Sequence, residues 1–234
     1  VENLVIVYTS TECVDFIVNS VEAILNKEFN KSLADREIHN MDGFTGTGTF
    51  IVRLLQSGII KKEDLLYKYT NEIHANEIVL LAYYIAAINI EEVFHDLMET
   101  DGYIPFEGIV LTDTFQLYEE WKKEHSNEIK MDILPENSER ARKQKELPIT
   151  VIMGNPPYSV GQKNQDDDAK NLKYPKLDKQ ISETYVKYST TSIRRNLYDS
   201  YISAFSWASD RIFDTGVISF ISNASIIASN TMNG

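Results

Sequence analysis

Two spacings of apolar residues alternate along the chain, and together they predict an α/β protein. Between residues 11 and 25, apolar side chains recur three and four residues apart, which is the spacing of one helix face. They are Val14, Ile17, Val18, Val21, Ile24 and Leu25. Short apolar runs predict buried strands instead, and they lie at residues 65–69, 109–115, 149–153 and 216–223, with a weaker candidate at 36–41. Strands that alternate with helical stretches predict a mostly parallel sheet with helices on both faces.

The run at 149–153 is followed by Gly154 and then by Asn155-Pro156-Pro157-Tyr158. Proline has no N–H to donate to a neighbouring strand, so two successive prolines end the strand. Ligands of parallel α/β sheets bind beyond the carboxyl ends of the strands. The Asn155 side-chain oxygen and the Pro156 carbonyl are two acceptors suited to an exocyclic amino group, and the Tyr158 ring offers a flat face to a planar base. The plain alternative is a proline-rich turn without a function.

A glycine-rich segment at residues 42–50 precedes another helical pattern. Gly46 and Gly48 carry no Cβ, so the backbone there can approach a ligand closely, and the following helix presents its first amides. The segment is not a phosphate-binding P-loop, because no Gly-Lys-Ser/Thr follows, and it lacks the dinucleotide Gly-x-Gly-x-x-Gly pattern. A glycine-rich turn without a function is again the plain alternative.

An acidic residue after the second predicted strand is a candidate ribose ligand, because a carboxylate accepts hydrogen bonds from both hydroxyls. Glu72 follows the run at 65–69 and is assigned this role, with its neighbour Ile73 beside it. The distance from Asp42 leaves room for one loop and one helix, as in a β-α-β unit. Glu77 is the runner-up, and it is otherwise interpreted as the first turn of a helix over 77–89.

The order of these segments resembles that of the γ-class N6-adenine DNA methyltransferases. Asn155-Pro156-Pro157-Tyr158 matches the Asn-Pro-Pro-Tyr motif of amino-methyltransferases, and residues 42–50 resemble the Asp-Pro-x-x-Gly-Thr-Gly-x-Phe loop that cradles S-adenosylmethionine. Gly43 stands where that family usually has Pro. The resemblance covers about residues 7–227. More narrowly, three segments look like the methyltransferase part of type ISP restriction-modification enzymes, namely 154–162, 173–178 and 197–202.

This resemblance implies a Rossmann-like, S-adenosylmethionine-dependent methyltransferase fold whose last strands lie beyond Gly234. It implies a catalytic role for Asn155, Pro156 and Tyr158, which would hold an adenine flipped out of duplex DNA, with no metal. The implied cofactor-binding residues are Thr9, Asp42, Phe44, Gly46, Gly48, Glu72, Ile73 and Asp113.

Two of these implied ligands carry specific alternatives. In the family, the Thr of a Tyr-Thr-Pro segment touches the methionine end of the cofactor; here that residue is Thr9, and Ser10 replaces the Pro. The alternative for this segment is an ordinary amphipathic helix without a contact to the cofactor. In the family, an Asp at the place that Asp113 occupies here accepts a hydrogen bond from the cofactor's adenine amino group. Asp113 is equally well placed to be a helix N-cap, and both interpretations stay open.

The resemblance also implies a division of the chain. Residues 1–35 form an N-terminal helical segment, 36–149 the cofactor-binding half, and 150–234 the substrate-binding half with a mobile loop at 159–196. Type ISP enzymes join a nuclease, a helicase-type ATPase, a methyltransferase and a target-recognition domain in one polypeptide. The expected partners are therefore DNA and those domains on a longer chain, with the target-recognition domain absent from these residues.

Two rival functions remain open. Protein-glutamine methyltransferases also carry Asn-Pro-Pro-Tyr, although the long insert after Tyr158 and the Tyr8-Thr9 segment argue against that group. A degenerate methyltransferase-like module without catalysis is favoured by Gly43, by Ser10 and by the weak strand at 36–41.

Composition narrows the class further. The 234 residues carry a net charge of −12, which disfavours a self-sufficient DNA-binding surface because phosphate contacts need basic side chains. One cysteine, Cys13, excludes a disulfide framework and fits a reducing cytoplasm. The longest apolar stretch, 78–90, is too short for a membrane span and is interpreted as a buried helix. Asp166, Asp167 and Asp168 lack the spacing of a calcium loop, so no metal is expected.

Overall fold

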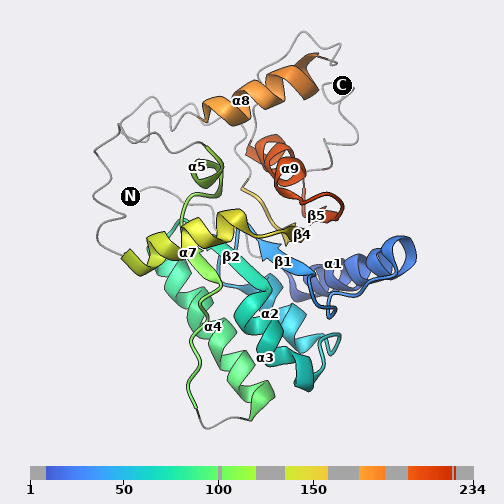
Figure 1. The fold of residues 1–234 in the computed structure, drawn as a ribbon, viewed down its shortest axis with the longest axis vertical. Coiled ribbons are helices and arrows are strands. Elements are labelled where there is room, and N and C mark those ends of the chain that lie inside the picture. The colour runs from blue at the N-terminus through green and yellow to red at the C-terminus, as the bar shows by residue number, and fades with distance from the viewer. Residues whose placement is uncertain are drawn as a thin grey trace.

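The computed structural model describes residues 9–99, 102–119, 135–157, 174–187, 200–222 and 224. Five strands in these residues form one parallel sheet in the order β3-β2-β1-β4-β5. The strands are β1 (His39–Asp42), β2 (Ile73–Glu77), β3 (Ile109–Leu111), β4 (Ile149–Gly154) and β5 (Val217–Phe220). The expected α/β fold, a parallel sheet flanked by helices as in Rossmann-like methyltransferases, is confirmed (Figure 1).

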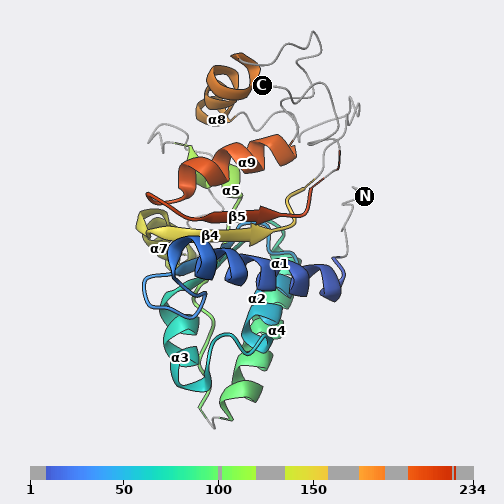
Figure 2. The ribbon, with the colours of Figure 1, turned by 90° about the vertical axis from the view of Figure 1, so that its right-hand side faces the viewer.

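Helices cover both faces of the sheet. Figure 2 shows β4 and β5 edge-on, with α1 to α4 on one side and α5, α8 and α9 on the other. The helices are α1 (Thr11–Ile24), α2 (Thr49–Gln56), α3 (Lys62–Asn71), α4 (Leu80–Met98), α5 (Thr114–Tyr118), α7 (Pro135–Glu146), α8 (Pro175–Ile181) and α9 (Ser200–Arg211). Two π-helical turns, η1 (Leu25–Phe29) and η2 (Ser182–Val186), extend α1 and α8.

A separate hydrophobic core fills the space on each side of the sheet, and β4 contributes side chains to both cores. Val151 and Met153 belong to the core on the α1 to α4 side, whereas Ile152 belongs to the core under α9. Successive side chains of a strand point to opposite faces, so a strand covered on both faces is usually apolar at most of its positions. This is why the apolar run at 149–153 predicts a buried strand.

The prediction of a strand at 65–69 is wrong. These residues lie in α3, where Leu65 and Tyr69 are buried and stand four residues apart, on one helix face. Glu63 and Asp64 in the first turn favour a helix there, because carboxylates are stabilised at helix N-termini. The second strand comes later, at Ile73–Glu77, and is polar in sequence, as is β1. Both strands are nevertheless buried in the middle of the sheet.

The helix expected at 77–89 is α4, and it begins three residues later than predicted because Glu77 still pairs with β3. The prediction of a buried helix at 78–90 is correct for one face of α4 alone. Ile90 is completely buried, but Leu81 is 70% exposed and Ile88 is 61% exposed. No helix in the described ranges is long and apolar enough to cross a membrane.

The expectation of a mobile loop at 159–196 needs a correction in its middle. Residues 174–187 contain α8 and η2, and Leu177 and Ile181 are fully buried under α9. The remaining residues of that loop, including the three aspartates at 166–168, lie outside the described residues, and so does Tyr158 before it.

Candidate active site

The sheet order predicts a ligand-binding crevice between β1 and β4. The chain leaves β1 towards β2 on one side and leaves β4 towards β5 on the other. Loops that depart in opposite directions open a crevice at the carboxyl ends of the strands, where α/β proteins bind ligands. Asp42 is the last residue of β1, and Gly154 is the last residue of β4. The two predicted motifs therefore meet at one place, although more than a hundred residues separate them.

The two strand ends touch closely. A Cβ added to Gly154 would lie 2.8 Å from Oδ1 of Asp42, so a larger residue at position 154 would displace the Asp42 carboxylate. Asp42 is buried, and its Oδ1 accepts a hydrogen bond from the N–H of Phe44. Burial raises the pKa of Asp42 to about 7. Its Oδ2 is buried and has no hydrogen-bond partner in the part of the chain that the structure describes. Such an atom is costly to leave unpaired, and a ligand with a donor would satisfy it.

The glycine-rich loop follows Asp42 with a defined backbone. Gly46 and Gly48 have positive φ angles of 57° and 89°, a backbone conformation that glycine adopts more readily than residues with a Cβ. The two positions differ in their surroundings: a Cβ on Gly46 would meet open space, whereas one on Gly48 would lie 3.2 Å from Ile90 of α4. Gly46 therefore serves the turn, and Gly48 also permits the close packing of the loop on α4.

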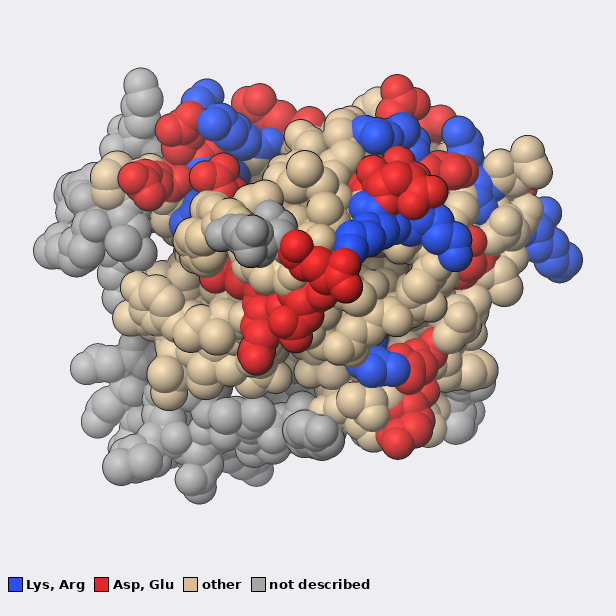
Figure 3. Space-filling view, turned by 90° about the horizontal axis from the view of Figure 1, so that it is seen from below, with Lys and Arg blue, Asp and Glu red and all other residues tan. Residues whose placement is uncertain are grey.

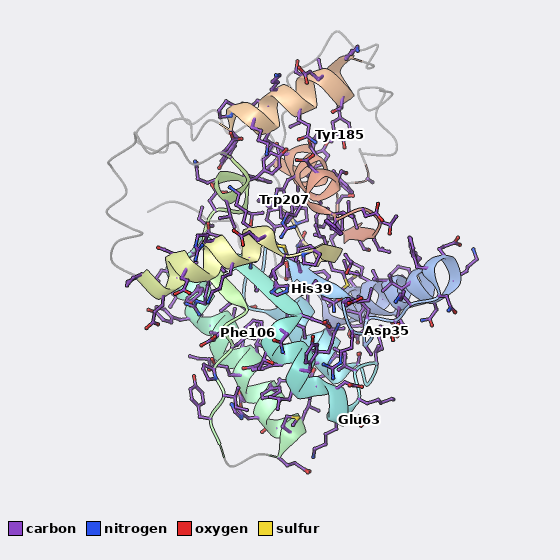
Figure 4. All side chains as sticks on the ribbon, in the orientation of Figure 1. Asp35, His39, Glu63, Phe106, Tyr185 and Trp207 are labelled. Carbon is purple, nitrogen blue, oxygen red and sulfur yellow. The ribbon has the colours of Figure 1, made fainter. Side chains whose placement is uncertain are left out.

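Trp207 explains why Gly43 replaces the usual proline of this loop. A Cβ at position 43 would lie 2.7 Å from the Trp207 ring, so a larger residue there would collide with α9. Trp207 projects from α9 towards the sheet (Figure 4). Its ring also meets the edge of Phe44, with centroids 5.7 Å apart. The departure at Gly43 is thus compensated by an aromatic side chain from the other half of the chain.

The structure does not bring Glu72 and Ile73, two of the predicted cofactor-binding residues, to this crevice. Both stand at the amino end of β2, whereas the crevice lies at the carboxyl ends of the strands. The Glu72 carboxylate accepts hydrogen bonds from Nζ of Lys68 at 2.7 Å and from the N–H of Glu37 at 2.7 Å. Ile73 is buried in the core on the α1 to α4 side. Both side chains are therefore part of the packed interior.

Glu77, the runner-up, occupies the position expected of a ribose ligand. It is the last residue of β2, and its carboxylate accepts hydrogen bonds from the N–H of Gly46 at 2.7 Å and of Val79 at 2.7 Å. Burial raises its pKa. Ile78 follows and is 59% exposed, so a flat ligand could lie against it. The helical spacing of Leu65 and Tyr69 was the sequence signal that could have moved the assignment from Glu72 to Glu77.

Thr9 lies beside the Asn-Pro-Pro-Tyr motif. Nδ2 of Asn155 donates a hydrogen bond to Oγ1 of Thr9 at 3.0 Å. Ser10, which stands in place of the family's proline, caps α1 by accepting a hydrogen bond from the N–H of Cys13. The Pro156 side chain is buried, and the Pro157 carbonyl accepts a hydrogen bond from the hydroxyl of Ser200 at 2.9 Å. The N-terminal segment and α9 therefore both hold the strand end.

Asp113 is the N-cap of α5, as one of its two interpretations required. Its Oδ1 accepts hydrogen bonds from the N–H of Phe115 at 2.9 Å and of Gln116 at 3.4 Å. Its Oδ2 accepts a hydrogen bond from the hydroxyl of Tyr174 at 2.6 Å. The capping role does not exclude a ligand contact, because a carboxylate has about four lone-pair sites.

Among the residues that the structure describes, no three His, Cys, Asp or Glu side chains are placed to hold a metal ion together.

Comparisons with known proteins give solved structures but no family model. No protein-family model and no curated protein matches the chain. The chain is 50% identical, over 97% of its residues, to a nuclease-deletion mutant of the Type ISP restriction-modification enzyme LlaGI in complex with a DNA substrate mimic, with a TM-score of 0.89. It is 51% identical over 99% of its residues to the ATP-dependent Type ISP restriction-modification enzyme LlaBIII bound to DNA, with a TM-score of 0.90. It is 40% identical over 98% of its residues to DrdV in a DNA complex, with a TM-score of 0.87.

The chain spans a small part of each of these proteins, namely 19% of the LlaGI mutant, 16% of LlaBIII and 22% of DrdV. The resemblance expected from the motifs is confirmed: this chain is similar, over nearly its whole length, to one segment of Type ISP restriction-modification enzymes.

Proposed function

We propose that this protein transfers a methyl group from S-adenosylmethionine to the N6 amino group of adenine in DNA, as part of a restriction-modification enzyme. The observation that carries the proposal is the contact between Asp42 and Gly154, which brings the glycine-rich loop and the Asn-Pro-Pro-Tyr motif to one crevice. A cofactor held by the loop would lie next to a substrate held by the motif. The similarity to Type ISP restriction-modification enzymes supports this reaction and DNA as the substrate.

The residues present fit S-adenosylmethionine. The unpaired Oδ2 of Asp42 is an acceptor for a cofactor donor, and Glu77 at the end of β2 is suited to the ribose hydroxyls. Ile78 offers an exposed apolar side chain next to Glu77. Asp113, two residues after the end of β3, is suited to accept a hydrogen bond from the adenine amino group. Once bound, the cofactor supplies an electrophilic methyl group on a sulfonium.

The remaining chemistry belongs to the residues after β4. The Asn155 side-chain oxygen and the Pro156 carbonyl are assigned to the two N–H donors of the adenine amino group. These contacts orient the nitrogen lone pair towards the methyl group and increase electron density on the nitrogen. Thr9 restrains Asn155 from the other side through the hydrogen bond to Nδ2. Positioning of this kind supplies a large part of the rate in a direct displacement, which needs no covalent enzyme intermediate.

Replacement of Asn155 tests the proposal. In a full-length polypeptide that contains this chain, we expect Asn155→Ala to abolish methyl transfer to DNA, because the side chain is assigned to the substrate. Affinity for the demethylated cofactor product, measured by calorimetry, should stay within about threefold. The assay uses tritiated methyl groups and separate DNA and protein acceptors. Asn71→Ala, a change on the exposed side of α3, is the matched control and should keep full activity. Substantial transfer by Asn155→Ala would remove this residue from the catalytic role, and transfer to protein instead of DNA would favour a glutamine methyltransferase.

A further inference from the structure

Tyr174 fixes the second oxygen of the Asp113 carboxylate. Its hydroxyl donates to Oδ2, while the first backbone amides of α5 donate to Oδ1. The Tyr174 ring stands edge-on to Phe115, the second residue of α5, with centroids 5.5 Å apart. The carboxylate is thus held from two elements that are far apart in the sequence.

The position of Tyr174 is set by α8, independently of Asp113. Tyr174 directly precedes α8, and the Glu119 carboxylate accepts hydrogen bonds from the first amides of that helix, those of Lys176 at 2.9 Å and Leu177 at 3.1 Å. Leu177 and Ile181 are fully buried in the core under α9. Because the helix is capped and packed, the tyrosine hydroxyl arrives at Asp113 from a rigid support.

We propose that Tyr174 is a positioning residue for recognition of the adenine end of the cofactor; this inference rests on the proposed function. Of the roughly four lone-pair sites of a carboxylate, three take the contacts from Phe115, Gln116 and Tyr174, so one on Oδ2 remains for the N–H of the adenine 6-amino group. Fixing both oxygens sets the plane of the carboxylate before the cofactor binds. The carboxylate then loses less conformational freedom when the cofactor binds. This increases the preference for a ligand with the 6-amino group over a ligand without it.

The test compares two ligands by calorimetry: S-adenosylhomocysteine and its analogue in which a keto oxygen replaces the 6-amino group. The wild-type protein should prefer the amino ligand, because the analogue cannot donate to Oδ2. In Tyr174→Phe, we expect this preference to fall about three- to tenfold, which is less than the loss of a whole hydrogen bond to a charged group would cause, because Asp113 itself is retained. Asp113→Asn sets the benchmark and should lower the preference at least as far.

The matched control is Tyr118→Phe. It removes a hydroxyl that joins α5 to α8 and α9 through Gln180 and Asp210, without a contact to Asp113. The ligand preference of this variant should stay within about twofold of the wild type. Thermal unfolding of each variant checks that the fold is retained, so that a change in preference is distinguished from a loss of folded protein.

Each other outcome overturns the inference at a different level. An unchanged preference in Tyr174→Phe, or an equal loss of affinity for both ligands, would make Tyr174 merely structural. Tighter binding of S-adenosylhomocysteine by Tyr174→Phe would mean that the hydroxyl competes with the cofactor. Equal affinities in the wild type would remove Asp113 from adenine recognition. If the wild type binds neither ligand, the proposed function itself fails.

Discussion

Glu72 and Glu77 show how position along one strand separates a structural carboxylate from a candidate ligand. Glu72 precedes β2 and pairs with Lys68, which also donates to the carbonyls of Asp35 and Ile38. Burial lowers the pKa of Lys68, and the contacts with Glu72 oppose that shift. Glu77 ends the same strand and contacts the glycine-rich loop.

Removing each of these glutamates should therefore have a different consequence. Glu72→Ala leaves the buried Lys68 ammonium without its partner, and we expect a loss of about 3–5 kcal/mol in the free energy of unfolding, measured by urea titration. The folded fraction should keep its cofactor affinity. Glu77→Gln should instead weaken binding of S-adenosylhomocysteine by about 1.5–3 kcal/mol, measured by calorimetry. A reversed pattern, with Glu72→Ala impairing binding at unchanged stability, would restore the original assignment.

Among the helices, α4 has two apolar faces, of which one is buried and the other is exposed. The face that carries Ala86, Ile90 and Phe94 packs against the sheet, whereas the opposite face carries exposed apolar side chains in its first turns. Counting apolar residues cannot distinguish these faces, because both are apolar. Their energetic weight differs, since only burial removes apolar surface from water.

A pair of substitutions on α4 measures this difference. Ile90→Ala should lower the free energy of unfolding by about 2–5 kcal/mol, because it opens a cavity in a fully buried site. Leu81→Ala, at a site that is 70% exposed, should change it by less than about 0.5 kcal/mol. The comparison is made by chemical denaturation of both variants. A loss of comparable size at Leu81 would mean that this face is covered in solution.

Strands β1 and β2 also carry a pair of histidines in contact, of which His74 is buried and His39 is partly buried. Nδ1 of His39 lies 3.0 Å from Nε2 of His74, and the rings are stacked. The pKa of His74 is lowered to about 3, first by burial and then by the positive charge of neighbouring groups, and burial also lowers the pKa of His39. A hydrogen bond between two ring nitrogens needs one of them unprotonated, which fits a neutral pair.

This pair predicts a pH dependence of stability. Between pH 6.5, the ordinary histidine value, and about 3, the unfolded chain binds a proton at His74 that the folded chain does not. The contribution of the neutral pair is therefore complete above pH 6.5 and is lost as the pH falls, by up to about 1.4 kcal/mol per pH unit for one group. Asp42, whose pKa is raised, acts in the opposite direction: its contribution is lost as the pH rises towards 7.

Urea unfolding of the wild type and of His74→Gln between pH 4.5 and 6.5 isolates the histidine contribution, because Asp42 is common to both. The wild type should lose stability more steeply than the variant as the pH falls. His95→Gln, a change outside the pair, serves as the control and should keep the wild-type slope. Identical slopes for the wild type and His74→Gln would contradict the prediction.

For the whole molecule, charge is the main constraint on function. The net charge is −12, and the face in Figure 3 interleaves Lys and Arg with Asp and Glu, without a continuous basic surface among its described residues. DNA affinity depends on basic side chains that replace counterions on the phosphates. The chain also spans at most 22% of the DNA-bound proteins that it resembles.

We therefore expect these 234 residues to bind S-adenosylhomocysteine but neither to select a DNA sequence nor to methylate duplex DNA at a useful rate. Flipping a base costs a few kcal/mol, which contacts to the flanking duplex normally offset. The check is an electrophoretic mobility assay beside a tritiated-methyl assay, with full-length LlaBIII as the positive control. Sequence-selective methylation by the 234 residues alone would show that target recognition lies within them.

The sequence by itself determined the parallel α/β fold, the strand at 149–153 and the two motifs, because a doubly covered strand is usually apolar and because proline and glycine act through their own backbone chemistry. It did not determine β2 or the role of Glu72. The strand Ile73–Glu77 is polar, and it is a strand because it lies between β1 and β3, so its hydrogen bonds come from neighbours that are distant in sequence. The contacts of Gly43 with Trp207, of Thr9 with Asn155 and of Asp113 with Tyr174 were likewise decided by tertiary structure alone. Each joins side chains that local spacing cannot relate, since long-range packing fixes which loops meet at the edge of the sheet.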